Sequence, residues 1–210
     1  MIQDPLFEKT ISYLSKVYRW SMYEEKTDFF RLKDILDSVS KSQWESKVWA
    51  VEELIKHVKG HHNMCIVIGG WYGLFSHLLT ERGFCHRIKN IDLDEECKTI
   101  GYGLCIHDNI RFDIGDGLSY LYDKRWNNHT RIFVCTACEH IDQDDLYKAL
   151  SQKDEDMLVC LQSNDYYDVA SHINCKENID EFVDSLPLKT ILYKGVNPQP
   201  EYNRFMVIGK

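Results

Sequence analysis

Residues 64 to 76 limit what this chain can fold into more than any other stretch. The apolar run Cys65 to Ile68 is typical of a buried strand, and three glycines in five residues follow it: Gly69, Gly70 and Gly73. The apolar residues after the turn recur at helical spacing: Leu74, Phe75, Leu78 and Leu79. A strand, a glycine turn and a helix in this order bring a backbone close to a nucleotide, because glycine permits a positive φ and has no Cβ.

Strand-like and helix-like segments alternate after this turn, which predicts a parallel, doubly wound α/β sheet. We expect strands near residues 64–68, 87–93, 109–114, 131–136 and 157–162. Helices are expected near 72–82, 94–104, 143–151 and 177–185, with a short helix ending near 123. The last two strands, 189–193 and 204–208, have no helix between them. They should pair as an antiparallel hairpin and complete a seven-stranded sheet.

The first 60 residues differ from the rest because their apolar pattern is helical. Residues 5–40 fit helices, and a further helix is expected over 44–58 with one apolar stripe: Trp44, Val48, Val51, Ile55 and Val58. We therefore divide the chain into a helical N-terminal lid or extension, residues 1–60, and a nucleotide-binding domain, residues 61–210. A length of 210 residues suits one domain with a small extension.

Charge and apolar pattern restrict the partners and the location. The net charge is −8 and the sequence has no cluster of Lys or Arg of the kind that neutralises nucleic-acid phosphates, which disfavours a large polyanionic substrate and leaves only a local basic patch open. We expect a small-molecule or protein substrate instead. No apolar run approaches the ~20 residues of a membrane helix, and the N-terminus does not resemble a secretory signal. The eight cysteines mostly lie in apolar segments, which favours reduced thiols in a cytoplasmic protein.

Two aspartates follow the glycine turn at positions where nucleotide-binding sheets contact their ligands. Asp92 lies 19 residues after Gly73 (92 − 73) and ends a predicted strand, where a carboxylate can accept hydrogen bonds from ribose hydroxyls. Asp116 lies between two glycines after the next strand. Simpler interpretations stay open: the glycine turn only packs helix on strand, Asp92 is a strand-end carboxylate, and Asp116 caps a helix.

Together these features resemble the class I S-adenosylmethionine-dependent methyltransferases, a Rossmann-like family, over residues 64 to 210. The resemblance implies S-adenosyl-L-methionine as the cofactor, with Gly69 and Gly73 under its methionine and ribose portion. Asp92 would take the ribose hydroxyls, and Asp116 would meet the adenine amino group. The implied cofactor-binding residues are Gly69, Gly70, Trp71, Tyr72, Gly73, Asp92, Asp116, Gly117 and Thr136.

The glycine turn departs from the family pattern at two positions. Val67 stands where these methyltransferases usually carry an acidic residue, and Trp71 stands where they usually have a third glycine. Trp71 and Tyr72 would wall off the sulfonium end, where an aromatic face attracts a cation, or would pack under the N-terminal helices. These departures leave non-methyl chemistry open, namely aminocarboxypropyl transfer, cyclisation or elimination by a lyase.

The end of the fourth strand supplies the candidate catalytic residues. In methyltransferases this strand end faces the transferred methyl group. The sequence here has the form small residue-x-Glu-His, which resembles methyltransferases that act on small molecules or proteins. Glu139 could orient a nucleophile, and His140 could accept its proton near neutral pH. The alternative is a helix cap and a packed histidine. The Asn/Asp-Pro-Pro-aromatic motif of base-amino methylation is absent here, which agrees with the charge balance.

Cysteine spacing gives no reason to expect a metal site. Cys135 and Cys138 form a single C-x-x-C pair without a second pair, and Cys135 lies within a strand.

The segment after the fifth strand is the candidate substrate-binding loop. Asn164, Asp165 and Tyr166 lie there in a polar, aromatic sequence that suits a small-molecule pocket, or that is a solvated loop capping the next helix. Residues 161–167 and 203–209 also resemble a group of short phage and bacterial methyltransferase-like proteins.

Three functions follow from this pattern. The leading prediction is a methyltransferase that uses S-adenosyl-L-methionine and modifies a small molecule or a protein group. The second is a transferase, cyclase or lyase acting on another bond of the same cofactor. The third is a nucleotide-binding interaction module without catalysis.

Overall fold

The computed structural model describes residues 15–16, 19, 29–60, 62–123 and 132–210. The helices predicted within residues 5–40 fall partly on residues 1–14, 17–18 and 20–28, which lie outside the described residues, as do 61 and 124–131. The first complete helix within the described residues is α2, Phe29–Asp37.

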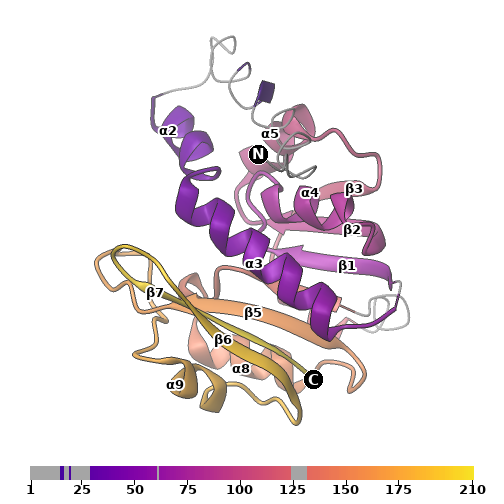
Figure 1. Cartoon of the computed structure of the whole chain (residues 1–210). Coiled ribbons are helices and arrows are strands. Elements are labelled where there is room, and N and C mark those ends of the chain that lie inside the picture. The colour runs from indigo at the N-terminus through magenta and orange to yellow at the C-terminus, as the bar shows by residue number, and fades with distance from the viewer. Residues whose placement is uncertain (1–14, 17–18, 20–28, 61, 124–131) are drawn as a thin grey trace, which may run out of the picture.

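The described residues form one seven-stranded sheet in the order β3-β2-β1-β4-β5-β7-β6 (Figure 1). The strands are β1 His62–Ile68, β2 Cys85–Asp92, β3 Ile110–Ile114, β4 Ile132–Cys135, β5 Leu158–Asn164, β6 Ile191–Pro198 and β7 Asn203–Gly209. β1 to β5 are parallel, whereas β7 is antiparallel to both β5 and β6. The predicted α/β class, seven strands and C-terminal hairpin are confirmed.

Helices cover both faces of this sheet (Figure 1). On one face, α2 packs with α3 Lys41–His57, α4 Leu74–Glu81 and α5 Glu95–Leu104. On the other lie α6 Ser119–Tyr122, α8 Gln143–Ser151 and α9 Ile179–Asp184.

The central strand β1 contributes to the core on both faces. Successive strand side chains point to opposite faces, so Cys65 and Val67 enter one core and Ile66 and Ile68 the other. All four are at most 3% exposed. This explains the continuous apolar run, because a parallel strand covered on both sides has no polar face. Val67 is therefore part of the core beneath the glycine turn.

Several element bounds differ by two or three residues from the prediction, and three differences bear on the site or the sheet edge. β5 continues to Asn164, because its end pairs with β7, Asn164 opposite Arg204. β6 continues to Pro198. The sequence did not predict this extension, because the edge strand is mostly exposed along its length and so lacks an apolar signal. A 3-10 turn, η1 Cys138–His140, follows β4 and was not predicted.

All eight cysteines are free thiols, and six of them are buried, as their apolar surroundings predicted. Among the described residues, no helix combines the length and apolar character needed to cross a membrane.

Candidate active site

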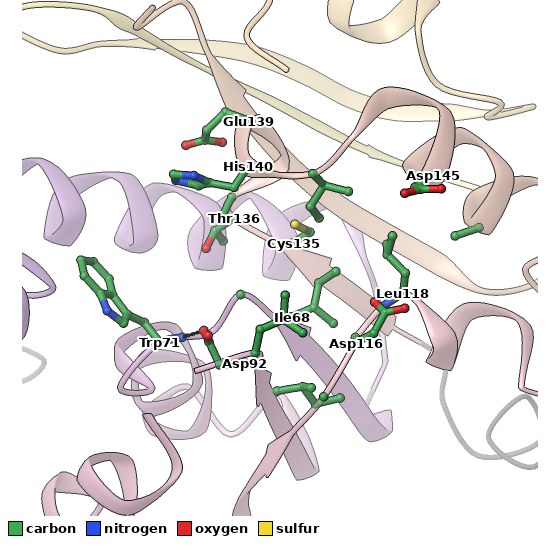
Figure 2. Close-up of a pocket in the computed structure, with 18 of the residues that line it drawn as sticks. Ile68, Trp71, Asp92, Asp116, Leu118, Cys135, Thr136, Glu139, His140 and Asp145 are labelled. Carbon is green, nitrogen blue, oxygen red and sulfur yellow. Dashed lines mark hydrogen bonds between the residues drawn. The ribbon is translucent and has the colours of Figure 1, made fainter. Parts of the chain in front are cut away.

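A cavity of about 870 Å³ opens at the carboxyl ends of β1, β2 and β4. Ligands bind at this edge of doubly wound sheets, and the volume suits a small-molecule pocket. Figure 2 shows Asp92 and Trp71 on one side, Glu139 and His140 on the opposite side, and Thr136 between them. Six of the predicted cofactor-binding residues line the cavity: Gly69, Trp71, Asp92, Asp116, Gly117 and Thr136.

Gly70 and Gly73 are not among the lining residues, and close packing with their neighbours explains why both are glycine. A Cβ at Gly70 would lie 2.2 Å from Oδ1 of Asn90, and one at Gly73 would lie 2.7 Å from Cζ of Phe112. Gly73 also has a φ of 90°, which side chains rarely adopt. For these two residues the simpler interpretation, a turn that packs helix on strand, describes the geometry.

Trp71 links the glycine turn to α2. Its backbone N–H donates to Oδ2 of Asp92 at 2.9 Å, and its indole N–H donates to Oδ2 of Asp34 at 3.0 Å. Its φ is 50°, and no other non-glycine residue among those described has a positive φ. Trp71 thus has a left-handed backbone conformation, which favours glycine, and it still lines the cavity.

Unlike its neighbour Trp71, Tyr72 is not among the residues that line the cavity. The residue is 1% exposed. Its hydroxyl donates to Oδ2 of Asp34 at 2.5 Å and accepts from Nη1 of Arg31 at 2.9 Å. Two polar side chains of α2 therefore hold the ring in the core, the packing alternative that the sequence left open.

Asp92 and Asp116 face the same cavity from neighbouring strands. Oδ1 of Asp92 accepts from the backbone N–H of Asp94 at 3.1 Å, whereas Oδ2 accepts from Trp71. Both oxygens of this carboxylate are therefore held in place. Oδ1 of Asp116 accepts from the N–H of Leu118 at 2.9 Å, so Asp116 forms a local Asx turn and does not cap helix α6, whose N-cap is Leu118. Each carboxylate has remaining lone pairs that can accept from a ligand.

Glu139 is held in the cavity wall by two buried partners. Its Oε1 accepts from Nη1 of Arg204 at 2.9 Å and from Nδ2 of Asn164 at 2.7 Å. Burial opposes the charge of Arg204, yet the adjacent Glu139 carboxylate raises the pKa of the guanidinium above its usual value. Glu139 is 2% exposed, and its Oε2 is buried without a hydrogen-bond partner among the described residues. An unsatisfied buried carboxylate oxygen is costly, so this atom is available to a bound group.

His140 is exposed and lines the cavity beside Glu139. Its Nδ1 lies 3.1 Å from the backbone oxygen of Ser171, and a carbonyl can only accept, so Nδ1 carries the proton. In the neutral ring the lone pair is therefore on Nε2, the nitrogen that can accept a proton or bind a cation.

Sequence reasoning missed Lys47, a buried lysine of α3 that lines the cavity. Its Nζ donates to Oε1 of Gln43, a second α3 residue of the lining. Burial, followed by the positive charge of Arg204, lowers the pKa of Lys47 to about 7, although Glu139 acts in the opposite direction. A lysine on a predicted amphipathic helix gives no signal of burial, because the sequence assigns it to the solvated face.

The predicted substrate residues contact other parts of the structure than the cavity. None of the three is among the lining residues. Asn164 supports Glu139, as described above. Asp165 accepts from the backbone N–H and the side-chain amide of Asn203 at 2.6 and 2.8 Å, and the Tyr166 ring stacks on Tyr202 with centroids 5.3 Å apart. β5 is longer than predicted, so Asn164 belongs to the strand, whereas Asp165 and Tyr166 follow it and contact the end of the β6–β7 hairpin.

The Cys135 and Cys138 thiols lie in the core rather than forming an exposed pair. Both residues are fully buried, and burial raises the pKa of Cys138 well above its usual value. Cys138 Sγ approaches the backbone oxygen of Cys135 at 3.8 Å. The thiolate form that metal binding requires is thus disfavoured.

Solved structures with the same fold are numerous, whereas no protein-family model and no curated protein sequence matches the chain. Magnesium protoporphyrin IX methyltransferase from Synechocystis PCC 6803, with bound SAM, has a TM-score of 0.59 and 14% identity and covers 97% of both chains. The N-methyltransferase NodS from Bradyrhizobium japonicum WM9 has a TM-score of 0.60 and 12% identity over 82% of this chain and 97% of its own.

A third neighbour is the E81Q mutant of MtNAS in complex with S-adenosylmethionine. Its TM-score is 0.55 with 11% identity, over 95% of this chain and 72% of that one. The chain therefore has the fold of the S-adenosylmethionine-dependent methyltransferases.

Proposed function

We propose that this protein binds S-adenosyl-L-methionine in the cavity and transfers its methyl group to a small molecule or a protein group. The observation that carries the proposal is that Asp92 and Asp116 line one cavity with Gly69, at the carboxyl edge of a methyltransferase-like sheet. In this arrangement Asp92 accepts hydrogen bonds from the ribose hydroxyls and Asp116 accepts one from the adenine amino group. Cofactor-bound neighbours with this fold support the choice of ligand.

Glu139 and His140 face Asp92 across the cavity, and this supports an acceptor site between the two sides. The acceptor atom attacks the methyl carbon in line, and the electron pair of the broken carbon–sulfur bond stays on sulfur, giving S-adenosylhomocysteine. Glu139 orients the acceptor, and Nε2 of His140 receives its proton. Positioning and exclusion of water supply most of the acceleration, so no covalent nucleophile is needed.

The N-terminal helices fit the role of a lid. Gln43 and Lys47 bring α3 to the cavity, and Asp34 on α2 holds the Trp71 indole at its edge. We assign residues 1–60 to this lid and residues 61–210 to the cofactor domain. The net charge of −8 favours a small molecule or a protein over a nucleic acid as the acceptor.

Calorimetric titration with S-adenosylhomocysteine tests the cofactor assignment. We expect one site per chain in the wild-type protein, and absence of heat at millimolar ligand would refute the proposal. Glu139→Ala and His140→Ala test the catalytic assignment. Both variants should bind the product yet lose methyl transfer, and full turnover in both contradicts the roles given to them.

Non-methyl chemistry is the second candidate, because Val67 is a core residue where the family has an acidic one and because a neighbour was crystallised with MTA and tNA. Incubation with S-adenosyl-L-methionine alone, followed by mass spectrometry, separates the candidates. Release of 5′-methylthioadenosine without S-adenosylhomocysteine supports the second candidate. Cofactor binding without conversion in the presence of cell extract supports a non-catalytic module.

A further inference from the structure

Three potential metal ligands meet beside the cavity: Glu139, His140 and His172. One ligand atom of each lies within 4.8 Å of the others. The two imidazole rings are nearly perpendicular, at 81°, with centroids 4.6 Å apart. Glu139 and His140 belong to the turn η1 after β4, whereas His172 belongs to the loop after β5. The fold therefore brings together residues that no sequence spacing would associate.

Both histidines hold their rings by the same device. Nδ1 of His140 contacts the backbone oxygen of Ser171 at 3.1 Å, and Nδ1 of His172 contacts that of Tyr166 at 2.7 Å. Since a carbonyl only accepts, each Nδ1 is protonated and each Nε2 carries the lone pair. Metal-binding histidines are commonly oriented in this way, by a hydrogen bond from the other ring nitrogen to a carbonyl or carboxylate.

The carboxylate of Glu139 has one oxygen anchored and the other buried without a partner among the described residues. Its Oε1 is occupied by Arg204 and Asn164, at 2.9 and 2.7 Å, which fixes the plane of the group. Its Oε2 is buried and has no hydrogen-bond partner within the described part of the chain. Glu139 is only 2% exposed, so its unpaired oxygen has little access to bulk water. A bound ion would satisfy this oxygen.

We propose that Oε2 of Glu139 and the Nε2 atoms of His140 and His172 bind a divalent transition metal. Two imidazoles and one carboxylate suit Zn²⁺, with Fe²⁺, Co²⁺ and Ni²⁺ as chemically related ions. Three protein ligands leave a fourth position for water or a substrate oxygen, as in catalytic zinc sites.

The open position would face the cavity, because Glu139 and His140 line it. The metal would then hold an acceptor oxygen opposite the cofactor, and His140 would act on the acceptor through the metal rather than by direct contact. This role rests on the proposed function, whereas binding of the metal does not.

A second histidine–carboxylate group, His77, Glu81 and His107, meets the same distance limit. Its atoms already contact one another: Nε2 of His107 lies 2.9 Å from Nδ1 of His77 and 3.3 Å from Oε1 of Glu81. Because its side chains already contact one another directly, this second group serves as the comparison site.

The test is titration of the chelator-treated full-length chain with Zn²⁺ by calorimetry and with Co²⁺ by visible absorption. We expect one ion per chain with the d–d bands of nitrogen and oxygen ligation. His172→Ala and Glu139→Gln should each weaken binding about tenfold or more, whereas His107→Ala should bind as the wild type does. Circular dichroism verifies that each variant is folded. If the buried Glu139→Gln variant does not fold, His172→Ala still tests the site, because it removes a partly exposed side chain.

No stoichiometric binding by the wild type, or wild-type affinity in folded His172→Ala, would overturn the proposal. Loss of binding in His107→Ala alone would also overturn it, by placing the ion in the other group. Titration with S-adenosylhomocysteine separates this proposal from the previous one. Normal Zn²⁺ binding without nucleoside binding refutes only the cofactor assignment, and nucleoside binding without Zn²⁺ binding refutes only the metal site.

Discussion

Nη1 of Arg204 lies 2.9 Å from Oε1 of Glu139, although 65 residues separate them and their side chains are 5% and 3% exposed. Arg204 belongs to β7, and Glu139 to the turn after β4. The antiparallel hairpin that closes the sheet therefore also supplies the cation that stabilises a carboxylate of the cavity. Nη1 of Arg204 further donates to the backbone oxygen of Thr136 at 3.3 Å, so one side chain fixes two residues of the wall.

Arg204→Met should destabilise the protein by about 3 kcal/mol, because it leaves the Glu139 charge buried without its partner. The double variant Glu139→Gln/Arg204→Met should recover part of this loss, since no isolated charge remains. Urea unfolding measures both. Lys194→Met is the control, because the ion pair of Lys194 with Asp180 is exposed and should contribute less than about 1 kcal/mol. Equal losses in the single and double variants would contradict the ion-pair explanation.

Asp92→Ala should weaken S-adenosylhomocysteine binding about 10- to 100-fold, the equivalent of losing ~1.5–3 kcal/mol of charge-assisted hydrogen bonding. Part of the loss is indirect, because Asp92 also orders the backbone N–H groups of Trp71 and Asp94. Asp113→Ala is the matched control, since Asp113 pairs with Lys89 at 2.7 Å and is not a lining residue. Calorimetry should show wild-type affinity for Asp113→Ala, and equal weakening in both variants would remove Asp92 from the ribose site.

The sheet and its cofactor edge were predictable because their signals are local. A buried parallel strand is a continuous apolar run, as in β1, and a strand end is marked by the polar residue that follows it. Asp92, Asp116, Glu139 and His140 were found in this way, and all four line one cavity. Their chemical roles stay predictions.

Three features were not predictable because they depend on packing between distant segments. Lys47 looks like a solvated helix residue, and only the docking of α3 over the strand ends buries it. Arg204 reads as a surface residue of an edge hairpin, yet β7 is inserted between β5 and β6 and is covered on both sides. Tyr72 was expected at the cavity because it adjoins the glycine turn, but Asp34 and Arg31 on α2 hold its hydroxyl away from it.

Lys47 should make stability depend on pH in the alkaline range. Its pKa is lowered from 10.5 to about 7 by burial first and by Arg204 second. Between these pH values the unfolded chain holds the proton and the folded chain does not, so the free energy of unfolding rises with pH. Below pH 7 both states are protonated, and the full cost of burying the charge is present.

Urea unfolding at several pH values tests this sign. From pH 7.5 to 9.5 the wild type should gain up to ~1.4 kcal/mol per pH unit relative to Lys47→Met, and Lys47→Met should be the more stable of the two at pH 6. Lys194→Met should keep the wild-type slope. Parallel curves for the wild type and Lys47→Met would show that Lys47 keeps its ordinary titration.

Trp71 has a φ of 50°, so the backbone and the side chain at this position can be tested separately. Trp71→Gly and Trp71→Ala both remove the indole bond to Asp34, but only glycine is unstrained at this φ. Trp71→Gly should therefore be more stable than Trp71→Ala by about 1 kcal/mol in thermal or urea unfolding. At Leu93, which is 75% exposed and has no positive φ, the order should reverse, with alanine the more stable replacement. If alanine is the better replacement at both positions, the turn does not hold Trp71 in the left-handed conformation.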